Sequence, residues 1–153
     1  KSDCAFLMSV IKRFYSDKPE IQIIQADGDL VQTGRSMNAI IKLFQPLEKS
    51  IYRDRSIILC DKPQNSEHLN DLYRKYPFLK SNSQVFELPA HSLEEHYPEN
   101  SEWQRDNMTV AKMSSRQKLV LAKKAGEGIS KQQFETDMPI AFSALKKCWD
   151  SAF

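Results

Sequence analysis

Apolar and polar positions along this chain follow two different rhythms. Apolar residues recur three or four positions apart over residues 4–15 and again over 67–76, which predicts amphipathic helices. Segments of strand length, rich in branched and aromatic residues, lie at 21–24, 57–60 and 84–88. Strands that alternate with helices through short connections are typical of a parallel sheet flanked by helices. We therefore predict an α/β fold.

The predicted series opens on a helix, and Asp3 is placed to cap it. A further helix is expected over residues 36–43, between the first two strands. A strand–helix–strand series that starts with a helix lacks its first strand, so we expect that strand upstream of Lys1 or from elsewhere. The chain also begins without Met or a signal-type apolar core, and we interpret it as a piece of a longer protein.

Beyond Pro98 the strand pattern stops and helical spacing takes over. Three helices are expected there, over residues 114–125, from a capping box at Ser130, and over 139–152. The sequence Gly126-Glu-Gly128 is expected to end the first of them. We therefore expect an α/β core over residues 1–98 and a helical extension over 99–153 that packs on it.

Composition places the chain among globular proteins. It has 153 residues, of which 41% are hydrophobic, enough for one domain with a core. No apolar run approaches the roughly 20 residues that a membrane helix needs. The three cysteines are odd in number and far apart, which argues against a disulfide framework and a CxxC metal site. We expect a soluble, cytoplasmic protein with no membrane partner.

The net charge of +2 is unevenly distributed. Residues 1–102 carry 13 Lys and Arg against 15 Asp and Glu, whereas residues 103–153 carry 9 against 5. A basic segment of this kind is either a set of solvated helix faces or a surface that meets a polyanion. Both interpretations stay open from composition alone.

Acidic residues follow the predicted strands. They are Asp27, Asp29, Asp61, Glu94 and Glu95. The carboxyl ends of parallel strands meet at one edge of a sheet, where ligands bind. Carboxylates gathered there repel one another unless they are protonated or bridged by a cation, and Mg²⁺ or Mn²⁺ prefers such oxygen ligands. The other interpretation is that each acid forms a turn or caps a helix.

Other kinds of site find little support in the sequence. His68, His91 and His96 do not show the spacing of a zinc site. No G-x-S-x-G elbow, P-loop or G-x-G-x-x-G motif occurs, and the cysteines stand in apolar contexts that keep thiols unreactive. The acidic strand ends are therefore the best candidate for chemistry.

Five short motifs occur along the chain in an order that is typical of one protein family. They are Lys1-Ser2-Asp3, Asp27-Gly28-Asp29, Cys60-Asp61-Lys62-Pro63, the segment from Leu88 to Pro98 that contains Leu93-Glu94, and Lys118-Leu-Val-Leu-Ala122. Together they resemble a Toprim domain of the type that forms the C-terminal nuclease of OLD-family (overcoming lysogenization defect) ATPases and their relatives in bacterial anti-phage systems. In that family a first strand ends in Glu-Gly-x-x-Asp, the third carries Asp-x-Asp, and Leu-Glu-x-Tyr and Lys-x-x-x-Ala elements follow. The resemblance implies a Rossmann-like sheet whose first strand and glutamate precede Lys1.

The resemblance also implies a metal-dependent endonuclease. Asp3, Asp61 and Glu94 would hold Mg²⁺ or Mn²⁺ in a two-metal site, and Lys118 would face the scissile phosphate. Asp61 and Lys118 are then the catalytic candidates. The implied partners are nucleic acid, DNA before RNA, an N-terminal ATPase domain through which alone ATP acts, and a second copy or a defence-system protein.

One departure keeps alternatives open. Pro63 stands where the second aspartate of Asp-x-Asp is expected, and it offers no ligand. A degenerate Toprim module that binds nucleic acid or a partner subunit without cleavage is therefore the main alternative, and an unrelated response-regulator-like α/β fold is a remote one. Either Glu94 or Glu95 could be the acid of the fourth-strand element, and Asp3 could serve only as a helix cap.

Overall fold

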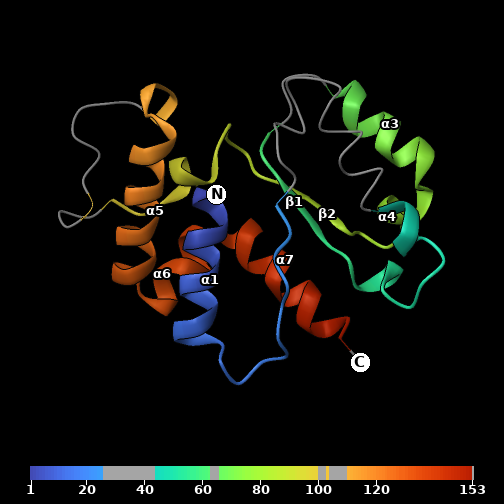
Figure 1. Ribbon diagram of the computed structural model, residues 1–153, viewed down its shortest axis with the longest axis horizontal. Coiled ribbons are helices and arrows are strands. Elements are labelled where there is room, and N and C mark those ends of the chain that lie inside the picture. The colour runs from blue at the N-terminus through green and yellow to red at the C-terminus, as the bar shows by residue number, and fades with distance from the viewer. Residues whose placement is uncertain (26–43, 63–65, 100–102, 104–109, 153) are drawn as a thin grey trace.

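The computed structural model describes residues 1–25, 44–62, 66–99, 103 and 110–152. The elements in chain order are helix α1 (Ser2–Phe14), 3₁₀ helix η1 (Arg53–Arg55), strand β1 (Ile58–Cys60), helices α3 (Glu67–Lys75) and α4 (Pro77–Ser81), strand β2 (Val85–Glu87), 3₁₀ helices η2 (Leu93–His96) and η4 (Val110–Lys112), and helices α5 (Ser115–Gly128), α6 (Lys131–Asp137) and α7 (Pro139–Asp150). Figure 1 shows α1, α5 and α6 on one side of the molecule, the strands with α3 and α4 on the other, and α7 between them. No helix within the described ranges is both long enough and apolar enough to cross a membrane.

The two strands pair in parallel. Ile58 lies opposite Val85, and Cys60 lies opposite Glu87. Gln84, which precedes β2, is fully buried. Its side-chain amide donates to the carbonyls of Arg53 and Ser56 at 2.7 and 2.8 Å, and these bonds hold the start of β2 beside the segment that leads into β1. The prediction of a mixed α/β protein with parallel strands is confirmed at this level.

The strand predicted over residues 21–24 is wrong. The structure assigns no regular secondary structure to residues 21–25. Ile21 and Ile23 pack against the main core, while Ile24 is 56% exposed. A run of branched residues favours extended backbone, but a strand also needs a partner for its hydrogen bonds. The helix predicted over residues 36–43 lies outside the described residues.

Helix α1 forms as its spacing predicts, with Phe6, Leu7 and Val10 buried. The prediction that Asp3 caps it is wrong. The helix begins at Ser2 with Lys1 in the cap position, so Asp3 lies in the first turn. A carboxylate there is still favoured by the helix dipole, and it is free to face neighbouring elements.

Helix α6 begins directly after Ser130, as its predicted capping box requires, and α5 begins after a second capping box at Ser114. In both boxes a serine and a glutamine exchange hydrogen bonds, Ser114 with Gln117 and Ser130 with Gln133. The helix extends beyond the predicted boundary at residue 125, because α5 passes through Gly126 and ends at Gly128, the last residue of the Gly126-Glu-Gly128 sequence. A Cβ on Gly126 would lie 2.9 Å from the Cβ of Ser9, so the glycine allows α5 to approach α1 closely.

The described residues form two hydrophobic clusters. The larger joins α1, η2 and helices α5 to α7, and the smaller joins β1 with α3 and α4. The N-terminal helix thus shares its core with the C-terminal helices. The division of the chain at residue 98 stays a prediction.

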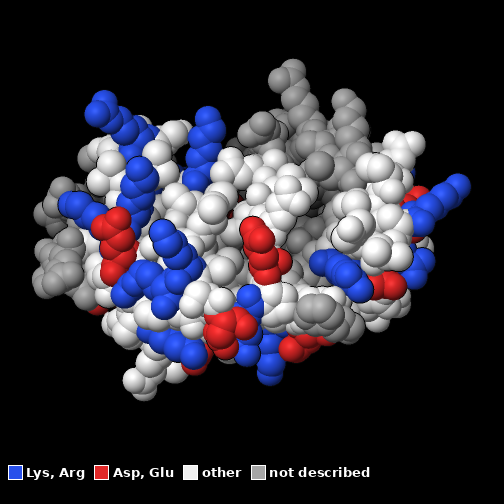
Figure 2. Space-filling view, turned by 60° about the horizontal axis from the view of Figure 1, so that its bottom comes forward, with Lys and Arg blue, Asp and Glu red and all other residues white. Residues whose placement is uncertain are grey.

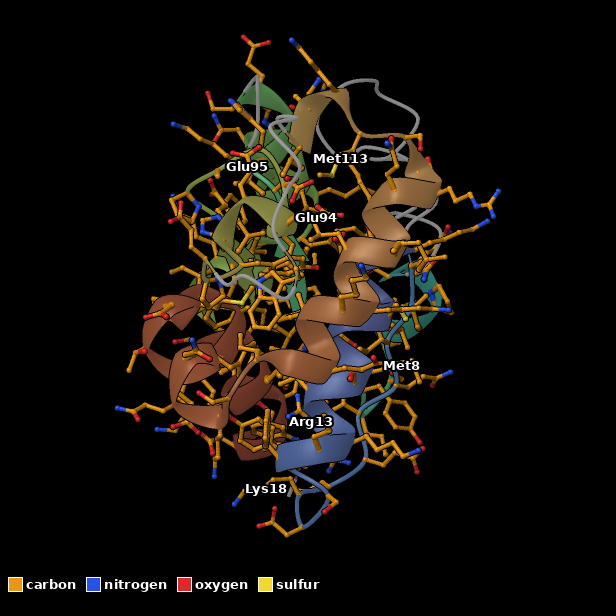
Figure 3. All side chains as sticks on the ribbon, turned by 90° about the vertical axis from the view of Figure 1, so that its left-hand side faces the viewer. Met8, Arg13, Lys18, Glu94, Glu95 and Met113 are labelled. Atoms are coloured by element: carbon orange, nitrogen blue, oxygen red, sulfur yellow. The ribbon has the colours of Figure 1, made fainter. Side chains whose placement is uncertain are left out.

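Arg13 ties the end of α1 to the end of α5 (Figure 3). Its Nη1 donates to the carbonyl oxygens of Gly126 and Ile129 at 2.6 and 3.0 Å. A cation at the end of a helix satisfies carbonyls that lack partners within the helix.

We expect Arg13→Ala to lower the free energy of unfolding by about 1–2 kcal/mol, measured by urea denaturation. Lys12→Ala, at the exposed neighbour, is the control and should change it by less than about 0.5 kcal/mol. Equal effects of the two variants would contradict this role of Arg13.

Candidate functional site

Three of the residues predicted for the site come together. Asp3 lies in the first turn of α1, Glu94 in η2 and Lys118 in the first half of α5. Burial raises the pKa of Asp3 above its ordinary value, and the charge of Glu94 raises it further. The ammonium group of Lys118 lowers this pKa in part. Two carboxylates and a lysine from three separate elements therefore share one electrostatic environment.

Packing of η2 turns Glu94 inward. Leu93 and Tyr97, on either side of it, are 1% and 3% exposed, and they hold this short helix against the core. Glu94 itself is only 2% exposed, whereas Glu95 is exposed. Figure 3 shows Glu94 on the side of η2 that faces α5 and Glu95 farther from that helix. Of the two acids that the sequence left open, Glu94 is the one that lies in the site.

Two buried oxygens in this site make no hydrogen bond within the described part of the chain. They are Oε1 of Glu94 and the hydroxyl of Tyr97. The Tyr97 ring stacks on Phe6 with 4.4 Å between ring centroids, which fixes its position. Burial raises the pKa of Tyr97, as do the charges of Glu94 and Asp3. A buried carboxylate oxygen without a partner is costly, and a bound cation or proton would relieve that cost.

Asp61 follows β1 at the carboxyl end of the sheet, and the adjacent Lys62 amide donates to the Ala90 carbonyl at 2.9 Å. Burial, Glu87 and Asp61, in that order, raise the pKa of the Cys60 thiol to about 12. The charges that shift the pKa of Asp3 do not include Asp61. The structure thus brings Asp3, Glu94 and Lys118 together and does not show Asp61 with them.

The described residues contain no complete set of metal ligands. Across the described ranges, no group of three or more His, Cys, Asp or Glu side chains is arranged to hold a metal ion. Asp27, Asp29 and Pro63 lie outside the described residues. The two-metal arrangement implied by the resemblance therefore stays a prediction, and the carboxylates at hand are those of Asp3 and Glu94.

No role was predicted for two residues beside this site. Tyr97 contributes its stacked ring and unpaired hydroxyl. His96 is half-buried, its Nε2 makes no hydrogen bond among the described residues, and burial lowers its pKa, so it is neutral at pH 7. Both follow Glu94 closely in the sequence. The sequence does contain a signal for them: Leu93 and Tyr97 flank the polar residues 94–96. Polar residues between two buried apolar ones are expected to include groups that face inward.

The donor set suits a hard cation and a phosphate. Mg²⁺ is usually held by one or two carboxylates and completes its coordination with water and phosphate oxygens. Asp3 and Glu94 can supply those carboxylates, and the unpaired Oε1 of Glu94 is the atom that most needs such a partner. Lys118 offers a point charge of the kind that binds phosphate. The residues present therefore fit one Mg²⁺ or Mn²⁺ ion next to a phosphate group.

Asp3, Glu94 and Lys118 are thus the predicted site residues that the fold places in one electrostatic environment. The resemblance of the motifs around them to those of Toprim domains stays a prediction. No protein-family model, no curated protein and no solved structure matches this chain.

Proposed function

We propose that this chain cleaves phosphodiester bonds in nucleic acid with the help of a divalent metal ion, as the Toprim nuclease domain of an OLD-like ATPase in anti-phage defence. One observation carries the proposal. Glu94 buries a carboxylate oxygen that has no hydrogen-bond partner among the described residues, and its charge acts on a second carboxylate, Asp3, which also feels the charge of Lys118. A fold keeps such a costly arrangement where it serves chemistry.

The residues of the site have separable roles in this proposal. Asp3 and Glu94 hold the Mg²⁺ or Mn²⁺ ion, which when bound lowers the pKa of a water molecule and stabilises negative charge on phosphate oxygens. Lys118 donates hydrogen bonds to the phosphoryl oxygens and balances the charge that develops on them in the transition state. Tyr97 keeps its hydroxyl proton, because its pKa is raised. The stacking of its ring on Phe6 fixes the position of the tyrosine beside the site.

The basic helices supply the surface for nucleic acid. Figure 2 shows Lys and Arg side chains gathered over the left-hand, helical part of the molecule, with Asp and Glu side chains between them. That part contains α1, α5 and α6 (Figure 1). Contacts of Lys and Arg with phosphates release counterions, so affinity should fall steeply as salt is raised. The upstream ATPase domain is proposed to drive or gate cleavage.

The test compares two lysines of α5 in the full-length protein. Plasmid DNA is incubated with Mg²⁺ or Mn²⁺, with and without EDTA and ATP, and cleavage is followed on gels. We expect cleavage that EDTA abolishes, and Lys118→Gln should lower its rate by about 100-fold, since it removes a charge at the developing oxyanion. Lys123→Gln, at an exposed position of the same helix, should leave the rate nearly unchanged.

Two results would overturn the proposal. If Lys118→Gln cleaved as fast as Lys123→Gln, the lysine would not act on the phosphate. If the unmodified protein bound DNA but showed no EDTA-sensitive cleavage under any ATP condition, the chain would be a binding module, as the alternative holds.

A further inference from the structure

A second polar site lies at the other end of the sheet. It is a groove with a volume of about 710 Å³. Asp54 and Arg55, which precede β1, line one side, and Asn82 and Ser83, which precede β2, line another. Because the strands are parallel, both segments lie at the amino ends, whereas Asp61 and Glu94 follow the carboxyl ends. Figure 1 shows the C-terminal end of α7 beside this region.

The groove carries positive charge that the described part of the protein does not neutralise. Its carboxylate, Asp54, is already held by Arg53 at 3.0 and 3.3 Å and by the side-chain amide of Asn82 at 3.1 Å. Arg55 and Lys147 also line the groove, and neither forms an ion pair with any described residue. Two free cations beside a compensated acid favour an anionic ligand.

Ser83, which also lines the groove, has a left-handed backbone conformation, with a φ of 53°. This conformation ends helix α4, because the Ser83 amide donates to the Lys80 carbonyl at 3.1 Å and the Gln84 amide donates to the Leu79 carbonyl at 2.9 Å. A serine in that conformation costs about 1–2 kcal/mol, which glycine would avoid. The turn leaves the Ser83 side chain exposed at the groove, where its hydroxyl can donate a hydrogen bond to an oxyanion.

We propose that this groove binds the phosphate of a nucleotide, either free or within a nucleic-acid strand. Arg55 and Lys147 supply charge, and the hydroxyl of Ser83 donates a hydrogen bond. The volume exceeds what one phosphate fills and lies in the range of sites for small organic ligands. Ile51, which lines the groove and is 72% exposed, offers an apolar contact for the attached sugar or base. The groove is separate from Glu94, so this inference does not depend on the proposed nuclease.

The test measures binding to the intact protein in EDTA, which keeps the metal-dependent site from taking up phosphate. Calorimetry is run with dTMP and with inorganic phosphate, and fluorescence anisotropy with a labelled ten-residue oligothymidylate. We expect Arg55→Gln to weaken binding of dTMP about tenfold or more, because a charged hydrogen bond is lost. Lys49→Gln, at an exposed lysine that does not line the groove, is the control and should bind as the unmodified protein does.

Ser83→Gly separates a ligand role from a structural one. It should raise the melting temperature, since the left-handed strain is removed, and at the same time weaken binding of dTMP by about two- to tenfold. If both groove variants lost binding of the oligothymidylate, the ligand would be a nucleic-acid strand. If they lost only binding of dTMP or of inorganic phosphate, the ligand would be a free phosphate compound. If none of the three probes bound, or if both variants bound them as tightly as the unmodified protein, the proposal would be overturned.

Discussion

Glu94→Gln should lower the rate of metal-dependent cleavage by about 100-fold or more and, in the absence of metal, make the protein more stable at pH 7. The substitution keeps the size of the side chain and removes one charge. The present carboxylate is 2% exposed, has an oxygen without a hydrogen bond and lies near a second acid. Burial of an unpaired charge costs free energy, so its removal should raise the free energy of unfolding by about 1–3 kcal/mol.

The stability gain should depend on pH in a defined direction. The pKa of Asp3 in the folded protein is raised above its value of 3.8, partly by Glu94. A carboxyl group of this kind lowers stability as the pH rises from its unfolded-state pKa through its folded-state pKa. Without the Glu94 charge that loss is smaller. Urea denaturation in EDTA should therefore show a small advantage of Glu94→Gln near pH 4 and the full advantage at pH 7.

Two controls accompany this prediction: the effect of Mg²⁺ on stability and a substitution of the neighbouring acid, Glu95. Mg²⁺ should raise the melting temperature of the unmodified protein by mass action and leave that of Glu94→Gln unchanged. Glu95→Gln changes the exposed neighbouring acid and should alter neither cleavage nor stability. If Glu94→Gln were less stable than the unmodified protein at pH 7 and Mg²⁺ stabilised both equally, Glu94 would be a structural residue and not a metal ligand.

Elements with local signals were predictable from the sequence. Ser114 and Ser130 each stand three residues before a glutamine, and both helices begin there because the serine and the glutamine satisfy each other's backbone amides. Elements that depend on distant partners were not predictable. Residues 21–24 have the composition of a strand but none is assigned to them, and Gly126 resembles a helix terminator but serves as a contact point for α1. In both cases a segment far away in the chain decides the outcome.

The candidate site also has features that were predictable from the sequence and features that were not. Its acids and Lys118 could be named from motif order, and three of the four predicted residues do meet. The unpaired state of Glu94 could not be predicted, because it follows from the burial of η2 between Leu93 and Tyr97. Motif order gives the sequence of strand ends, but the distances among Asp3, Glu94 and Lys118 depend on how α1, η2 and α5 pack against one another.

Phe6→Ala should cause the largest loss of stability of the variants considered, about 3–5 kcal/mol. The Phe6 side chain is fully buried, with its ring centroid 4.4 Å from that of Tyr97 and 6.1 Å from that of Phe134. Truncation removes both contacts and leaves a cavity where three elements meet. Since a typical domain has only about 5–15 kcal/mol of stability, this loss is a large share. Met8→Ala, at a position of α1 that is 58% exposed, should cost less than about 0.5 kcal/mol in the same urea experiment.

A second variant tests whether Phe6 also positions the site. Phe6 lies three residues after Asp3, so both project from one side of α1, and the ring that Phe6 stacks on belongs to Tyr97, the residue directly after η2, which carries Glu94. Phe6→Leu keeps apolar volume but loses the stacked ring, and it should cost about 1–2 kcal/mol. At a temperature where this variant is fully folded, Mg²⁺ should bind it more weakly than it binds Met8→Ala. Equal Mg²⁺ affinity of the two variants would mean that Phe6 stabilises the core without placing Asp3 against Glu94.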